Sequence, residues 1–121
     1  MMRFLLLAAA LGEGAFGVFI FAAPALALNL LFASEPSSGA IIMTRVAGIA
    51  LIGLGVACYP REPQPQALYG MLAYSVFVML YLITVGIKGA SGILLWPAVV
   101  VHALLSVSLI VAARSRVTQR T

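Results

Sequence analysis

Ionisable side chains are scarce in this sequence, and the scarcity excludes most classes of soluble protein. Only 8% of the 121 residues are Asp, Glu, Lys or Arg, and 64% are hydrophobic. A soluble domain is typically about one quarter charged. The mean hydropathy of +1.16 points the same way. We therefore predict a protein that resides in a membrane.

Cysteine and histidine each occur only once, as Cys58 and His102. A single cysteine forms no disulfide within the chain, and it lacks the partner thiol that membrane thiol oxidoreductases need. We interpret Cys58 as a small apolar side chain that fills space in the fold. No metal site is predicted.

Long apolar runs fill most of the chain. About 20 apolar residues are needed to cross a bilayer, and the runs lack the two-residue alternation of a membrane β-barrel. Backbone amides in hydrocarbon must be satisfied internally, so these runs should be helices. The connectors between them are too short for an extramembrane domain. The predicted fold class is all-α, a single-domain bundle (residues 1–121) with four transmembrane helices at Phe4–Phe32, Gly39–Tyr59, Ala67–Ile87 and Ile93–Ala113.

The net charge of +4 reports orientation in the membrane rather than affinity for nucleic acid. If the helices alternate in direction, Lys88 and the slightly embedded Arg45 belong to one side. The positive-inside rule then places both termini in the cytoplasm. The basic residues on the predicted cytoplasmic side are Arg3, Arg61, Arg114, Arg116 and Arg120.

The first apolar run imitates a signal peptide, because Arg3 precedes it and small residues follow. Its hydrophobicity continues to Phe32, so we interpret it as an uncleaved helix. Pro24 should kink this helix. A kink beside several phenylalanines could border a groove for lipid or quinone, although aromatic packing is the favoured explanation.

Small residues predict where helices approach closely. They recur at a spacing of four residues, and the run 39–59 carries them on two faces, so this helix is predicted to pack centrally. The serines of "ASEPSSG" can cap its start. Trp96 and Pro97 suggest that the last helix begins near them. The spaced pairs are Ala8 and Gly12, Ala10 and Gly14, Thr44 and Gly48, and Gly53 and Ala57.

Three ionisable residues within the predicted spans, Glu13, Arg45 and His102, are candidates for function because burying such groups in a bilayer is costly. At 1.5 Å per residue, Arg45 and His102 should lie at similar depths, whereas Glu13 should lie about 8 Å to the cytoplasmic side of its helix centre. A bridge from Glu13 to Arg45 would then need tilt or an extended side chain. Tyr74 and Tyr81 share one helix face and could extend a polar ladder.

Each of these residues also has a purely structural interpretation. Glu13 could hydrogen-bond to a tyrosine or serine as a protonated acid, and we favour this structural role. Arg45 could extend to the outer surface. His102 could hydrogen-bond across helices, take part in a proton relay, or act as the single axial ligand of a haem or chlorophyll. The axial role is not favoured, and the sequence requires no cofactor.

The pattern "TRVAGIALIGLGVACYP", followed by "GMLAYSVFVMLYL" and "LLWPAVVVHALLSVSLI", resembles small uncharacterised four-helix membrane proteins of bacteria. The resemblance implies a bacterial inner-membrane location. It supplies no catalytic or ligand-binding motif.

Residues suited to helix packing are abundant in this sequence, whereas residues that could bind a polar ligand or catalyse a reaction are few. The leading hypothesis is therefore a non-catalytic accessory or structural subunit, within a homo-oligomer or beside a larger membrane complex. The alternative is a protein that binds or transports a small molecule, lipid or quinone through Glu13, Arg45, His102, Tyr74 and Tyr81. An intramembrane enzyme ranks third.

Overall fold

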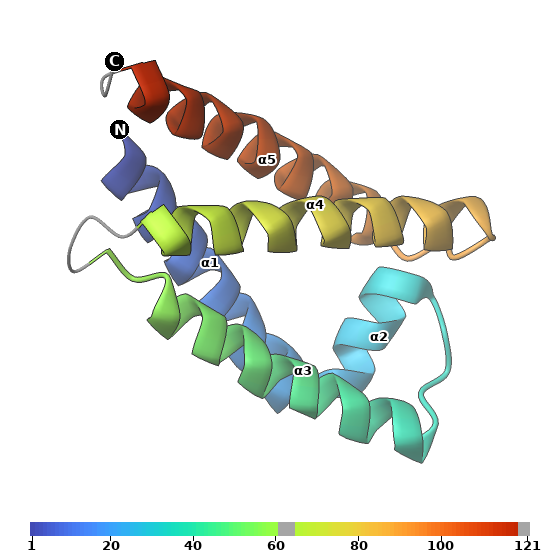
Figure 1. Cartoon of the computed structure of the whole chain (residues 1–121). Helices are drawn as coiled ribbons and strands as arrows, with labels where there is room; N and C mark the ends of the chain where they lie inside the picture. The colour runs from blue at the N-terminus through green and yellow to red at the C-terminus, as the bar shows by residue number, and fades with distance from the viewer. Residues whose placement is uncertain (61–64, 119–121) are drawn as a thin grey trace.

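A computed structural model describes residues 1–60 and 65–118, which form an all-α fold (Figure 1). By length and composition, α1, α3, α4 and α5 can each cross a membrane. The predicted all-α class and the presence of four apolar helices long enough to cross a membrane are therefore confirmed. Two arginines used to orient the chain, Arg61 and Arg120, lie outside the described residues. The helices are α1 (Met2–Ala22), α2 (Pro24–Phe32), α3 (Ser38–Ala57), α4 (Pro65–Ile87) and α5 (Leu95–Thr118).

The prediction of one kinked helix from Phe4 to Phe32 is wrong, because Pro24 ends α1 and starts a second helix. Ala23 has φ −128° and ψ 61°, outside the helical region, and Pro24 occupies the first turn of α2. Proline removes a backbone donor and disfavours helical geometry in the residue before it, but it fits a first turn well. In Figure 1, α2 turns sharply away from α1. Glu13 therefore lies next to the midpoint of α1, whereas the prediction placed it away from the centre of a longer helix.

Local sequence explains the starts of the later helices. Ser37 accepts a hydrogen bond from the Ala40 amide at 3.2 Å, so the predicted serine cap is present. The last helix begins at Leu95, beside the predicted start at Trp96 and Pro97.

The long helices form two antiparallel pairs, α1 with α3 and α4 with α5 (Figure 1). Helix α1 also contacts α2, α4 and α5, so it is the central element of the described chain. The prediction that the run 39–59 packs centrally is therefore wrong. Helix α3 buries only Gly48 and Gly55, and its second small-residue face remains exposed.

Glycines bring α1 and α3 into close contact. A Cβ atom added to Gly48 would lie 2.7 Å from the carbonyl oxygen of Gly17, and one added to Gly55 would lie 2.7 Å from that of Ala10. Real Cβ atoms do not approach backbone this closely, so neither glycine can be replaced without moving a helix. Backbone contact of this kind drives helix association in membranes, where burial of apolar surface gives little advantage.

Two apolar clusters lie along the bundle, with polar side chains between them. One includes Leu6, Leu68, Met71 and Leu109, and the other consists of Leu82, Leu95 and Val99 with its partly buried neighbours. Tyr74 and His102 lie between these clusters on α4 and α5. The fold thus places a polar layer within an otherwise apolar interior.

Cys58 belongs to the first cluster, as its interpretation as a small filler predicts. Its side chain is buried, and the thiol donates a weak hydrogen bond to the Ala67 carbonyl at 3.8 Å. Its burial within an apolar cluster is consistent with a packing role.

Helix α2 closes one end of the bundle. The Leu94 amide donates to the Leu30 carbonyl at 2.8 Å, linking the connector before α5 to α2. A Cβ atom on Gly92 would overlap the backbone of Leu31, so this close approach requires glycine. This contact fixes the position at which α5 starts, and His102 lies about two turns further along the same helix.

Candidate functional site

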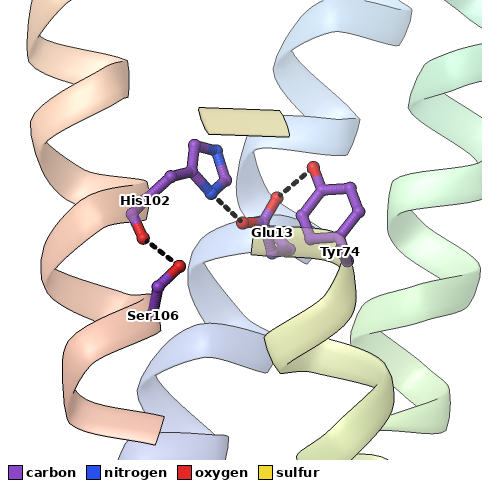
Figure 2. A network of polar contacts seen from close by, with 4 residues as sticks. All are labelled: Glu13, Tyr74, His102 and Ser106. Carbon is purple, nitrogen blue, oxygen red and sulfur yellow. Dashed lines mark hydrogen bonds and ion pairs between the residues drawn. The ribbon is translucent and has the colours of Figure 1, made fainter. Parts of the chain in front are cut away.

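Glu13, Tyr74 and His102 converge from three different helices (Figure 2). Glu13 comes from α1, is 7% exposed, and accepts a hydrogen bond from the Tyr74 hydroxyl through Oε2 at 3.0 Å. The structural interpretation of Glu13 expects a hydrogen bond to a tyrosine or serine, and this bond is present. Tyr74 itself is half-buried.

His102 lies on the other side of the carboxyl group. Its Nδ1 is 3.9 Å from Glu13 Oε1, which is beyond hydrogen-bond distance. The residue is 9% exposed, and Nδ1 is buried without a hydrogen-bond partner among the described residues. The imidazole also makes an edge contact with the Tyr74 ring, with centroids 5.7 Å apart and planes at 74°. Glu13, Tyr74 and His102 are called the polar cluster below.

Helical periodicity explains why these side chains face inward. On α5, Leu95, Val99, Ser106 and Leu109 are buried on the same side as His102, at spacings of three and four residues. Ser106 donates a hydrogen bond to the His102 carbonyl at 2.7 Å, which satisfies its hydroxyl within the helix (Figure 2). Ser106 therefore accompanies His102 without contacting its imidazole ring.

An open-sided groove of about 540 Å³ runs between α1 and α5 beside the polar cluster. Apart from Glu13 and His102, the side chains that line it are apolar. The α1 wall consists of Ala8, Ala9, Gly12, Glu13 and Phe16, and the opposite wall consists of Leu94, which precedes α5, and of Pro97, Ala98, Val101, His102 and Leu105 on α5. We call this the α1/α5 groove.

Arg45 and Tyr81 lie apart from the polar cluster. Arg45 is exposed on α3, and no ion pair joins it to Glu13 in the described part of the chain. Helix α3 packs on α1 and α2, and not beside α5, so a shared depth does not bring Arg45 near His102. Tyr81 is 67% exposed, so the expected polar ladder along α4 stops at Tyr74. A role for Arg45 or Tyr81 in binding a ligand stays a prediction.

The small residues that form the groove are not distinguished by their own spacing in the sequence. The spacing of Ala8 and Gly12 predicts a helix-packing pair, but both line the α1/α5 groove. The sequence did contain a signal for the groove. Ala98 and His102 on α5 have the same four-residue spacing as Ala8 and Gly12 on α1. Small residues on two facing helices leave space as readily as they permit contact.

Few side chains here could hold a metal or cofactor. The described residues contain no group of three or more His, Cys, Asp or Glu side chains arranged to bind a metal ion. Because Nδ1 of His102 faces Glu13, axial ligation of a haem or chlorophyll would have to use Nε2. That ligation stays a hypothesis.

The fold and the polar cluster together define a helical protein with four candidate membrane spans and a carboxyl, phenol and imidazole group gathered between three of them. Comparison with protein-family models, curated proteins and solved structures gives no match. The function must therefore be argued from the geometry of the groove and the polar cluster.

Proposed function

We propose that this chain is a membrane-embedded protein that binds a lipophilic molecule with a polar head group in the α1/α5 groove. One observation carries the proposal: Glu13 and His102, two of the few ionisable residues within the spans, both line a groove that is otherwise apolar. Ligand sites typically combine apolar walls with a few convergent polar groups, at volumes of about 300 to 1,000 Å³.

The unpaired nitrogen of His102 favours binding over a purely structural role. A structural hydrogen-bond network normally satisfies all its buried members, since an unpaired buried polar atom costs about 1 to 3 kcal/mol. The bond from Tyr74 satisfies one oxygen of Glu13, while Oε1 and His102 Nδ1 remain without a direct bond to each other. A polar head group in the groove would satisfy both atoms.

Filling the groove should abolish retention of a lipophilic ligand. Gly12 lines the groove, and a Cβ atom there meets nothing within 4 Å, so Gly12→Leu should place its side chain in the groove without distorting the fold. Gly53→Leu is the matched control, because Gly53 is also a helical, exposed glycine where a Cβ atom meets nothing within 4 Å, but it does not line the groove. Native mass spectrometry of chains extracted in mild detergent should find a bound lipophilic species in the wild type and Gly53→Leu only.

Two results would contradict the proposal. Equal retention by the wild type and Gly12→Leu would place the bound molecule elsewhere on the bundle. Absence of a bound species from the wild type, even after incubation with total membrane lipid extract, would indicate that the groove holds no lipophile.

A role as an accessory subunit is the second candidate, and the outer face of α3 favours it. Ala50, Gly53 and Ala57 are exposed there, and small residues of this kind support helix association in membranes. The same spectra test this candidate. A complex that Gly53→Leu dissociates would support a homo-oligomer or a partner subunit on α3, whereas single chains in every sample would argue against it.

We further propose a bacterial inner-membrane location with both termini in the cytoplasm. In Figure 1 the start of α1 and the end of α5 lie at the same end of the bundle. Arg3 belongs to the start of α1, and Arg114 and Arg116 belong to the end of α5. Lys88 lies at the opposite end, so the basic residues are unequally divided as the positive-inside rule requires.

Accessibility of introduced cysteines tests this orientation. In a Cys58→Ala background, a membrane-impermeant maleimide applied to intact spheroplasts should label Ser34→Cys but not Ser115→Cys, because both serines are exposed at opposite ends of the bundle. Labelling of both should require disruption of the membrane. Labelling of Ser115→Cys but not of Ser34→Cys in intact spheroplasts would indicate the opposite orientation, with both termini outside the cytoplasm.

A further inference from the structure

The gap between Glu13 and His102 indicates the chemistry of the head group. Resting on the proposed binding function, we infer that the molecule in the α1/α5 groove is a lipophilic alcohol or phenol whose hydroxyl oxygen bridges Glu13 Oε1 and His102 Nδ1. The bridge completes a hydrogen-bonded chain that begins at the Tyr74 hydroxyl (Figure 2).

The distance between the two atoms suits a single bridging oxygen. Oε1 and Nδ1 are 3.9 Å apart, too far for a direct hydrogen bond. One oxygen atom placed about 2.8 Å from each would form a hydrogen bond with both at ordinary length. Both residues line the groove, so a head group bound there lies next to the gap. Oε2 is already engaged by Tyr74, which leaves Oε1 for the ligand.

The protons available to the pair favour a group that both donates and accepts. An uncharged Glu13 donates from Oε1, and a neutral imidazole with its proton on Nε2, its intrinsically preferred site, accepts at Nδ1. A hydroxyl group accepts from the first and donates to the second. If the proton instead moves to His102, the roles reverse, and a hydroxyl still satisfies both atoms.

Other head groups require less favourable arrangements. A carbonyl or ether oxygen only accepts, so it would need the imidazole proton on Nδ1 as well as a proton on Glu13. An ammonium group only donates, so it would bring a full charge beside an ionised Glu13 in hydrocarbon, where burying charge is costly. Among these head groups, only the hydroxyl is accommodated without formal charge on either partner and with the preferred imidazole form.

Three photoactivatable probes of equal length test this inference. Each carries a mid-chain diazirine on a twelve-carbon chain, and the head groups are a hydroxyl, its methyl ether and a primary amine. The chain is embedded in phospholipid nanodiscs, irradiated with increasing probe, and mapped by peptide mass spectrometry. We expect saturable labelling of the groove walls by all three probes. Half-saturation should occur at about tenfold lower concentration for the alcohol than for the ether, because only the alcohol can donate a hydrogen bond to Nδ1 of His102.

Two variants test whether the preference for the alcohol over the ether depends on the bridge between Glu13 and His102. His102→Phe keeps an aromatic ring beside Tyr74 but removes the nitrogen, so the preference for the alcohol over the ether should disappear while groove labelling persists. Gly70→Leu should retain the full preference, because Gly70 is exposed on α4, does not line the groove, and a Cβ atom there meets nothing within 4 Å. If His102→Phe does not assemble, the comparison of the three probes on the wild type decides the question alone.

The outcomes separate this inference from the proposed function. Equal half-saturation by alcohol and ether on the wild type, or tighter labelling by the amine, would overturn the hydroxyl ligand and leave a lipophile-binding groove in place. An alcohol preference that survives in His102→Phe would overturn the bridge. Absence of saturable groove labelling by every probe would overturn the binding function itself, and the inference with it.

Discussion

Replacing Gly48 by valine is expected to push α1 and α3 apart and to destabilise the native bundle strongly. The Cβ position at Gly48 lies 2.7 Å from the Gly17 carbonyl oxygen and 3.0 Å from the Phe21 backbone nitrogen, so the clash is with backbone that cannot rotate away. Overpacking typically costs about 1 to 3 kcal/mol where side chains can adjust. Here a whole helix must move, and we expect a loss of at least about 3 kcal/mol.

This loss of stability can be measured by titrating the protein in mild detergent with SDS. The fluorescence of Trp96 monitors unfolding during the titration. Trp96 is the only tryptophan in the sequence, so its signal reports one location. Gly53→Val is the control, because it changes the same helix by the same substitution at an exposed position where a Cβ atom meets nothing within 4 Å. If the two variants unfold at the same SDS fraction, the Gly17 and Gly48 contact does not hold α1 and α3 together.

The elements of this fold were predictable because their signals are local. Apolar length predicted four spans, a serine predicted the start of α3, and the Trp96 and Pro97 pair predicted the start of α5. The effect of Pro24 was underestimated, since apolar continuity on both sides suggested one kinked helix. A proline can be accommodated within a helix or can begin a new one, and tertiary contacts such as that between Leu94 and Leu30 decide which occurs.

The composition of the polar cluster was only partly predictable, because depth along a helix does not determine which helices are neighbours. Glu13, Tyr74 and His102 were named from sequence, and the structure brings them together. Arg45 was expected at the depth of His102, but α3 packs on α1 and not beside α5. Small residues carried the same ambiguity. Gly48 forms a helix contact, whereas Gly12 lines a groove.

Replacing Glu13 by leucine is expected to lower stability and abolish ligand retention, and a second substitution should separate the two effects. Glu13→Leu leaves the half-buried Tyr74 hydroxyl without its acceptor, at a cost of about 1 to 3 kcal/mol. Adding Tyr74→Phe removes the unpaired donor, so the double variant should regain part of that loss. Coupling between polar partners within membranes averages about 0.6 kcal/mol and reaches about 1.7 kcal/mol.

Ligand retention should not recover together with stability. The double variant still lacks the Glu13 carboxyl group in the groove, so the bound lipophile should remain at least about tenfold depleted in native mass spectra, as expected when hydrogen bonds to its head group are lost. Tyr74→Phe alone is the control, since it removes only the bond to Oε2 and leaves Oε1 and His102 facing the groove. Recovery of both stability and retention in the double variant would mean that Glu13 only holds α1 against α4. Recovery of stability without retention would assign Glu13 to the ligand, with Tyr74 as the residue that positions its carboxyl group.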